Sequence, residues 1–100
     1  THLVGPLREQ FDMRAWAVDE DMWIRRAAII CQVGGKGRTV DPDLLSDCIE
    51  PNTADRTFWI TKAIGWALRD YAYADPAWVR AFVDAHDLAP LSVREATKHL

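Results

Sequence analysis

The sequence contains no run of about 18 consecutive apolar residues, the length that a bilayer-spanning helix requires. Its first residues also lack the charged and then apolar pattern of a secretory signal. We therefore expect a soluble, cytoplasmic protein. With 100 residues and 49% hydrophobic content, the chain has the size and composition of a single globular unit with a small core.

Residues that form disulfides or bind metals are few. Cys31 and Cys48 stand alone, with no C-x-x-C pair and no histidine at the spacing of a zinc site. His2, His86 and His99 are scattered along the chain. We therefore predict two reduced, mostly buried thiols, no metal and no cofactor.

The excess of basic residues that most nucleic-acid-binding proteins show is also absent. The chain carries 12 Lys and Arg against 15 Asp and Glu, which gives a formal net charge of −3. The overall charge therefore argues mildly against DNA binding, unless the basic residues cluster on one face.

Strand signals are missing, whereas the signals that start and stop helices are frequent. Asp41-Pro42 and Asp75-Pro76 each place a capping residue before a proline at the first helical position. Three further starts are predicted at Asp12, at Asp19 or Asp21, and at Asp55 or Thr57. A capping box formed by Ser92 and Glu95 predicts the start of a last helix that runs to the chain end. Helix stops are predicted at Gly34-Gly35 and at Pro51-Asn52. These signals predict an all-α fold of six or seven short helices.

One segment of the chain resembles another. Residues 23–28 (WIRRAA) align with residues 59–64 (WITKAI) at an offset of 36 residues, which is within the range of helical-pair repeats. The match favours a HEAT-like or TPR-like α-solenoid, in which one layer of helices lines a concave surface. An irregular helical bundle is about as compatible with this short match alone.

The predicted helix over residues 58–71 carries two distinct stripes at about 100° per residue. An apolar stripe spans an arc of about 140° and comprises Ile60, Ala63, Ile64, Ala67, Leu68 and Tyr71. An aromatic and basic stripe spans an arc of about 80° and comprises Trp59, Lys62, Trp66, Arg69 and Tyr73. A weaker copy of the second stripe is predicted earlier, where Trp16, Trp23 and Arg26 share a face that Asp19 interrupts.

The aromatic and basic stripe has two interpretations. Its tryptophans can pack on a neighbouring repeat while Lys62 and Arg69 extend to water, as such side chains usually do. Alternatively, the stripe lines a groove in which the cations bind phosphates and the indole faces contact a base or sugar. Spacing alone favours packing, because aromatic stripes at helical spacing usually belong to a core.

A glycine-rich loop at residues 34–39 (GGKGRT) contains two further cations. It lacks the spacing of a nucleotide-binding loop and follows a helix instead of a strand. We interpret it as a helix stop and link, with Lys36 and Arg38 as weaker candidates for phosphate contact.

Three motifs resemble a known family. KAIGWALRDYA (62–72) and DLAPLSVREATKHL (87–100) closely resemble the C-terminal part of the AlkD-type DNA alkylation repair proteins, which are HEAT-like-repeat DNA glycosylases. WAVDEDMWIRRAAI (16–29) resembles the preceding repeat of that family. The resemblance covers nearly the whole chain and implies an α-solenoid that wraps double-stranded DNA and excises positively charged N3- and N7-alkylated purines.

The resemblance also implies roles for individual residues. Trp66 is similar to the cleft tryptophan that approaches the lesion, and Arg26 to an arginine that lines the same cleft. Lys62 and Arg69 occupy positions that face the DNA backbone. The helical wheel selects the same helix face independently, which favours the groove interpretation. Trp23, Trp59, Lys36 and Arg38 are weaker candidates for DNA contact.

The chain departs from the family pattern at one important place. The catalytic aspartate of the family lies in a tryptophan-rich WWDxVD-like segment, which the sequence lacks. By the family order this segment would precede Thr1, so we expect the chain to be the C-terminal part of a longer, monomeric enzyme and to be inactive alone. Asp12, Asp19 and Asp21 are better explained as helix caps or solvated acids.

A different class of function stays open at this point. The net charge of −3 and the common use of helical repeats as interaction scaffolds favour a non-catalytic module that binds protein or nucleic acid.

Overall fold

The computed structural model describes residues 13–31, 33, 41–98 and 100, and the described residues form helices and no strand. The elements are α2 (Met13–Trp16), α3 (Met22–Ile30), α4 (Pro42–Ile49), the 3-10 helix η1 (Glu50–Asn52), α5 (Phe58–Ala72), α6 (Pro76–Ala85) and α7 (Pro90–Ala96). The predicted all-α fold is confirmed.

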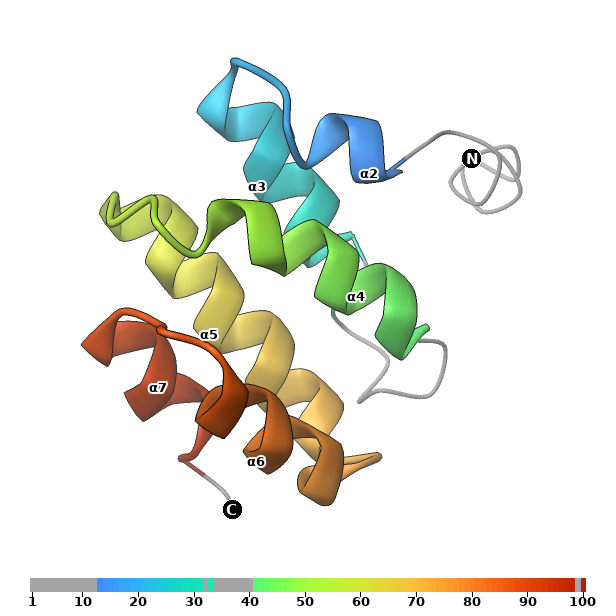
Figure 1. Cartoon of the computed structure of the whole chain (residues 1–100), viewed down its shortest axis with the longest axis vertical. Coiled ribbons are helices and arrows are strands. Elements are labelled where there is room, and N and C mark those ends of the chain that lie inside the picture. The colour runs from blue at the N-terminus through green and yellow to red at the C-terminus, as the bar shows by residue number, and fades with distance from the viewer. Residues whose placement is uncertain (1–12, 32, 34–40, 99) are drawn as a thin grey trace.

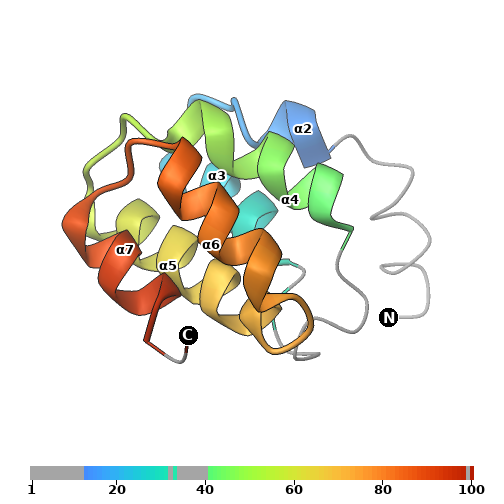
Figure 2. The same ribbon diagram turned by 60° about the horizontal axis from the view of Figure 1, so that its bottom comes forward.

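The helices stack in two layers (Figures 1 and 2). One layer contains α3, α5 and α7, with α5 in the middle and in its most extensive contact with α7. In the other layer, α2 and α4 pack on α3, while α6 packs on α5 and α7. This is the arrangement of a helical-repeat solenoid, and the two similar sequence segments lie on the adjacent helices α3 and α5.

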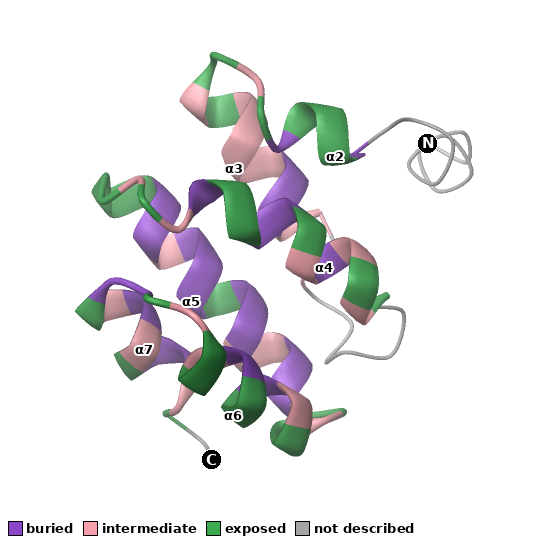
Figure 3. Cartoon of the chain, viewed as in Figure 1, coloured by how far each residue is buried: buried purple, intermediate pink, exposed green. Residues whose placement is uncertain are grey.

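The middle helix α5 supplies much of the core, and Figure 3 shows most of this helix in the purple of buried residues. Every residue of the predicted apolar stripe is buried, namely Ile60, Ala63, Ile64, Ala67, Leu68 and Tyr71. They join one apolar cluster with side chains from α3, α4 and α6, including Ile29, Leu45, Ile49 and Val79. Because the apolar stripe of α5 is buried in this core, the aromatic and basic stripe beside it can face outward.

Aspartate caps begin three of the helices as predicted. The Asp21 side chain accepts a hydrogen bond from Trp23 N and caps α3, while Asp41 and Asp75 cap α4 and α6 ahead of their prolines. Thr57 precedes α5 without a side-chain capping bond to any described residue, and Asp55 instead accepts from Thr57 N at 2.9 Å. Asp12 and Gly34-Gly35 lie outside the described residues.

Two predicted helix boundaries are wrong. The capping box at Ser92 is absent, because α7 begins earlier, at Pro90, and the Ser92 hydroxyl donates to the carbonyl of Thr61 on α5 at 2.7 Å. The same helix ends at Ala96, short of the chain end. The Ser92 hydroxyl, which the local pattern assigned to a helix cap, therefore forms a hydrogen bond between two helices instead.

The 3-10 helix η1 is tied to α6 through a histidine. His86 bonds through Nδ1 to the Phe82 carbonyl at 2.8 Å and through Nε2 to Glu50 at 2.7 Å. Burial lowers the pKa of His86, but the hydrogen bonds to Glu50 and Phe82 outweigh it, so the pKa lies above its ordinary value. Since both acceptors are oxygens, the charged imidazole fits this place best.

Cys31 and Cys48 form no disulfide, and Cys48 is buried while Cys31 is half-buried, in agreement with the predicted reduced thiols. Among the described residues, no cluster of three or more His, Cys, Asp or Glu side chains could hold a metal ion. No helix in this part of the chain is long and apolar enough to cross a bilayer.

Candidate nucleic-acid interface

Aromatic and basic residues of α5, with the residue that caps its C-terminus, form a partly exposed surface, which we call the α5 face: Trp59, Lys62, Trp66, Arg69 and Tyr73. Trp66 is 38% exposed and Trp59 is 45% exposed, although tryptophan is usually well buried. Lys62 and Arg69 are half-buried on either side of Trp66 along the helix. The core of the described residues therefore leaves much of both indole surfaces uncovered.

The start of α3 extends the α5 face. Trp23, Phe58 and Trp59 form an aromatic cluster, with ring centroids 5.6 Å apart for Trp23–Trp59 and 5.1 Å apart for Phe58–Trp59. Trp23 and Trp59 are the equivalent residues of the two similar segments, so the offset of 36 residues places them side by side. Packing thus explains part of the aromatic surface, yet Trp23 and Phe58 are each 54% exposed.

Trp16 does not belong to this surface. It ends α2, and the chain turns before Asp21 caps the separate helix α3. The prediction that Trp16 shares one helix face with Trp23 and Arg26 is therefore wrong, because residues 17–21 do not continue the helix.

Arg26, on α3, extends toward Trp59 on α5. Its guanidinium carbon is 6.0 Å from the centre of the Trp59 ring, a distance at which a cation is attracted to an indole face. Its Nε is buried and has no hydrogen-bond partner among the described residues. A buried donor without a partner is costly, so a movement of the Arg26 side chain that brings Nε to an acceptor would remove that cost.

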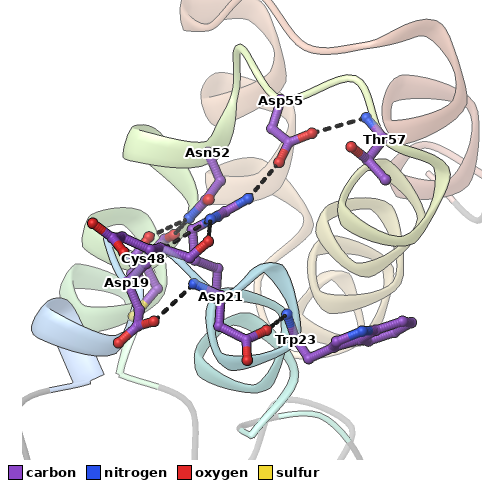
Figure 4. Close-up of polar contacts among 10 residues, drawn as sticks. Asp19, Asp21, Trp23, Cys48, Asn52, Asp55 and Thr57 are labelled. Carbon is purple, nitrogen blue, oxygen red and sulfur yellow. Dashed lines mark hydrogen bonds and ion pairs between the residues drawn. The ribbon is translucent and has the colours of Figure 1, made fainter.

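The adjacent arginine, Arg25, has a structural role instead. It pairs with Asp55 at 2.8 Å and donates to the carbonyl of Asp19, in the network that Figure 4 shows. Hydrogen bonds from Thr57 and then from Arg25 hold the pKa of Asp55 below its ordinary value despite burial. This network fixes the starts of α3 and α5 relative to each other, and so the aromatic cluster that they carry.

The buried amide of Asn52 completes the same network (Figure 4). Its Nδ2 donates to the carbonyls of Ala17 and Cys48 at 2.8 and 2.9 Å. These bonds join the turn after α2, the end of α4 and the segment that leads into α5.

Sequence reasoning missed the acid that lies beside the α5 face. Oε1 of Glu95, on α7, lies 2.9 Å from Lys62 Nζ and 3.4 Å from Arg69 Nη1. The hydrogen bond from Lys62 lowers the pKa of Glu95 against the opposing effect of burial, and the nearby positive charges add to the lowering. Glu95 is therefore ionised at neutral pH and shared between the two cations.

The structure thus places Arg26, Trp23 and Trp59 together at one end of the surface, with Lys62, Trp66 and Arg69 along α5. Phe58 and Glu95 are additions that the sequence analysis did not place at this surface, since it assigned Glu95 to a capping box instead. Lys36 and Arg38 lie outside the described residues.

Comparison with known proteins identifies the family. The sequence profile described as "DNA alkylation repair enzyme" matches residues 1–100. The chain belongs to the DNA alkylation repair enzyme family. The chain is also similar to the solved structure of a predicted DNA alkylation repair enzyme from Enterococcus faecalis, with 31% identity and a TM-score of 0.87. No curated protein matches the sequence.

The match covers 98% of this chain but 46% of the Enterococcus faecalis chain, so the chain spans about half the length of that family member. Membership of the DNA alkylation repair enzyme family associates the chain with DNA repair.

Proposed function

We propose that the intact protein is a monofunctional DNA glycosylase that excises positively charged N3- and N7-alkylated purines, and that this chain is its C-terminal, DNA-binding part. The observation that carries the proposal is the exposure of Trp66 between two cations on α5. An indole face attracts a cationic base, and flanking cations attract the phosphates beside it. Family membership supports DNA as the partner.

The proposed chemistry starts from the lesion itself. Alkylation at N3 or N7 leaves the purine positively charged, which weakens its glycosidic bond. As the bond breaks, positive charge develops on the sugar, and a nearby carboxylate stabilises it and positions water. The purine leaves as a neutral base with the bonding electron pair, the water oxygen bonds to the sugar carbon, and the proton that this water loses passes to the carboxylate or to solvent.

The roles of the described residues follow from their positions. Trp66 contacts the cationic base, while Lys62 and Arg69 bind backbone phosphates. The Arg26 guanidinium adds positive charge beside Trp59, and Trp23 and Trp59 add aromatic surface. We assign no catalytic residue in this chain and no metal or cofactor to it.

Glu95 is poorly suited to be the catalytic carboxylate. Only 10% of its side chain is exposed, and two cations share its charge. A carboxylate that is neutralised in this way stabilises a developing positive charge weakly. We therefore propose that the carboxylate comes from the part of the enzyme beyond these 100 residues, in an enzyme that acts as a cytoplasmic monomer.

The competing function is a non-catalytic module that binds protein or nucleic acid. The net charge of −3 favours it, because a duplex repels an acidic protein unless cations are concentrated locally. Base release distinguishes the two functions, since only the glycosylase breaks a glycosidic bond.

We expect the intact protein to release free N7-methylguanine from a duplex that contains this base, and the 100-residue chain alone to release none above background. Chromatography of the released base measures both reactions, with an unmodified duplex of the same sequence as the control. An intact protein that binds the duplex but never releases the base would establish the non-catalytic module instead.

A further inference from the structure

The two cations of the α5 face, Lys62 and Arg69, bond to the same carboxylate oxygen of Glu95. Lys62 and Arg69 occupy helix positions on either side of Trp66, yet Lys62 Nζ and Arg69 Nη1 both bond to Oε1 of Glu95, at 2.9 and 3.4 Å. Two like charges would otherwise repel each other and separate. The shared acceptor therefore brings both cationic groups to one place beside Trp66.

The packing of α7 on α5 fixes the position of Glu95. A Cβ on Gly65 would lie 2.7 Å from Glu95 Cβ and 3.2 Å from Ser92 Cα, so only glycine permits this close approach. The buried hydrogen bond from Ser92 Oγ to the Thr61 carbonyl, at 2.7 Å, joins the same two helices. Glu95 consequently extends from a closely packed contact between two helices.

We propose that Glu95 is a positioning residue that holds Lys62 and Arg69 together, so that both can bind a single backbone phosphate next to Trp66. The inference rests on the proposed function. The three side chains sum to a charge of +1, and each cation keeps free N–H donors, because ammonium has three and guanidinium has five. Convergent, positively charged donors match the oxygens of a phosphate.

Preorganisation is the physical advantage of this arrangement. Long cationic side chains lose rotamer freedom when they bind, which weakens binding. Glu95 restricts both side chains before DNA arrives, so less freedom is lost in the complex. A phosphate held in one place also sets the distance between the sugar and Trp66, and small errors in such distances slow a reaction strongly.

The test replaces Glu95 with glutamine in the intact protein, because Glu95→Gln preserves the shape of the side chain and removes its charge. We expect the single-turnover rate of N7-methylguanine release at saturating protein to fall about tenfold, since the two cations no longer converge. Binding to an undamaged duplex should not weaken, because the local positive charge increases. Glu20→Gln, at an exposed position in the turn before α3, is the matched control.

A double-mutant cycle separates positioning from a general structural role. In a Lys62→Gln/Arg69→Gln background, adding Glu95→Gln should cause no further loss of rate, because the groups that Glu95 positions are gone. The inference about Glu95 would be overturned by a loss of rate that persists in this background, or by a Glu95→Gln variant that is as fast as the unmodified protein. Neither result would contradict the proposed function. An unmodified protein that releases no base would instead overturn the proposed function.

Discussion

Replacement of Trp66 by alanine in the intact protein should slow release of N7-methylguanine about thirtyfold, the effect of losing a desolvated contact between a cation and an indole of about 2 kcal/mol. Binding to an undamaged duplex should change much less, because the proposed partner of Trp66 is the cationic base. The free energy of unfolding should fall by less than about 2 kcal/mol, since 38% of Trp66 is already exposed to solvent.

Trp16→Ala is the matched control for Trp66→Ala. Trp16 is 39% exposed but lies on α2, in the other layer of helices. Its replacement should leave base release unchanged. If Trp66→Ala instead costs about 3–5 kcal/mol of stability, and the folded variant releases the base at the normal rate, then Trp66 belongs to the core and not to a DNA groove.

Gly65→Ala should destabilise the protein by about 1–3 kcal/mol, as overpacking of a close contact does. At an open helix position the same change would stabilise by up to about 1 kcal/mol, because alanine is the better helix former. Here the new Cβ would lie 2.7 Å from Glu95 Cβ, and Ser92 Cα and the Ser92 carbonyl oxygen are each 3.2 Å away. Because two of these three atoms belong to the backbone of α7, that helix must shift.

Urea denaturation of the intact protein measures the effect of Gly65→Ala. The control is Ala81→Gly, at an exposed position of α6, which should cost about 1 kcal/mol through helix propensity alone. A Gly65→Ala variant as stable as the unmodified protein, or more stable, would contradict the close approach of α5 and α7.

The buried and exposed faces of α5 could be predicted from the sequence because this helix is long and strongly periodic. Every apolar residue that the wheel assigned to the core is buried, and Trp59 and Trp66 on the second stripe are exposed. The starts of α4 and α6 at Asp-Pro pairs could be predicted equally well, since capping depends on residues adjacent in sequence.

Features that depend on how the helices pack on one another could not be predicted from the sequence pattern. Ser92 and Glu95 match a local capping box, yet the approach of α7 to Gly65 directs one to the Thr61 carbonyl and the other to Lys62 and Arg69. Nothing in the spacing of these residues predicts an ion pair across two helices. The misplacement of Trp16 has a simpler cause, because a wheel assumes that the helix continues, whereas the chain turns after α2.

The central claim is that the α5 face binds the DNA backbone, and a salt titration of duplex binding by the intact protein tests it most directly. We expect Lys62→Ala and Arg69→Ala each to lower the slope of log affinity against log salt concentration by about 0.9, the contribution of the one phosphate that the two cations share. Either change leaves Lys62, Arg69 and Glu95 together without the net positive charge that neutralises this phosphate. Arg80→Ala, at an exposed position of α6 in the other layer, should leave the slope unchanged. Slopes for Lys62→Ala and Arg69→Ala equal to that of the unmodified protein would contradict the claim.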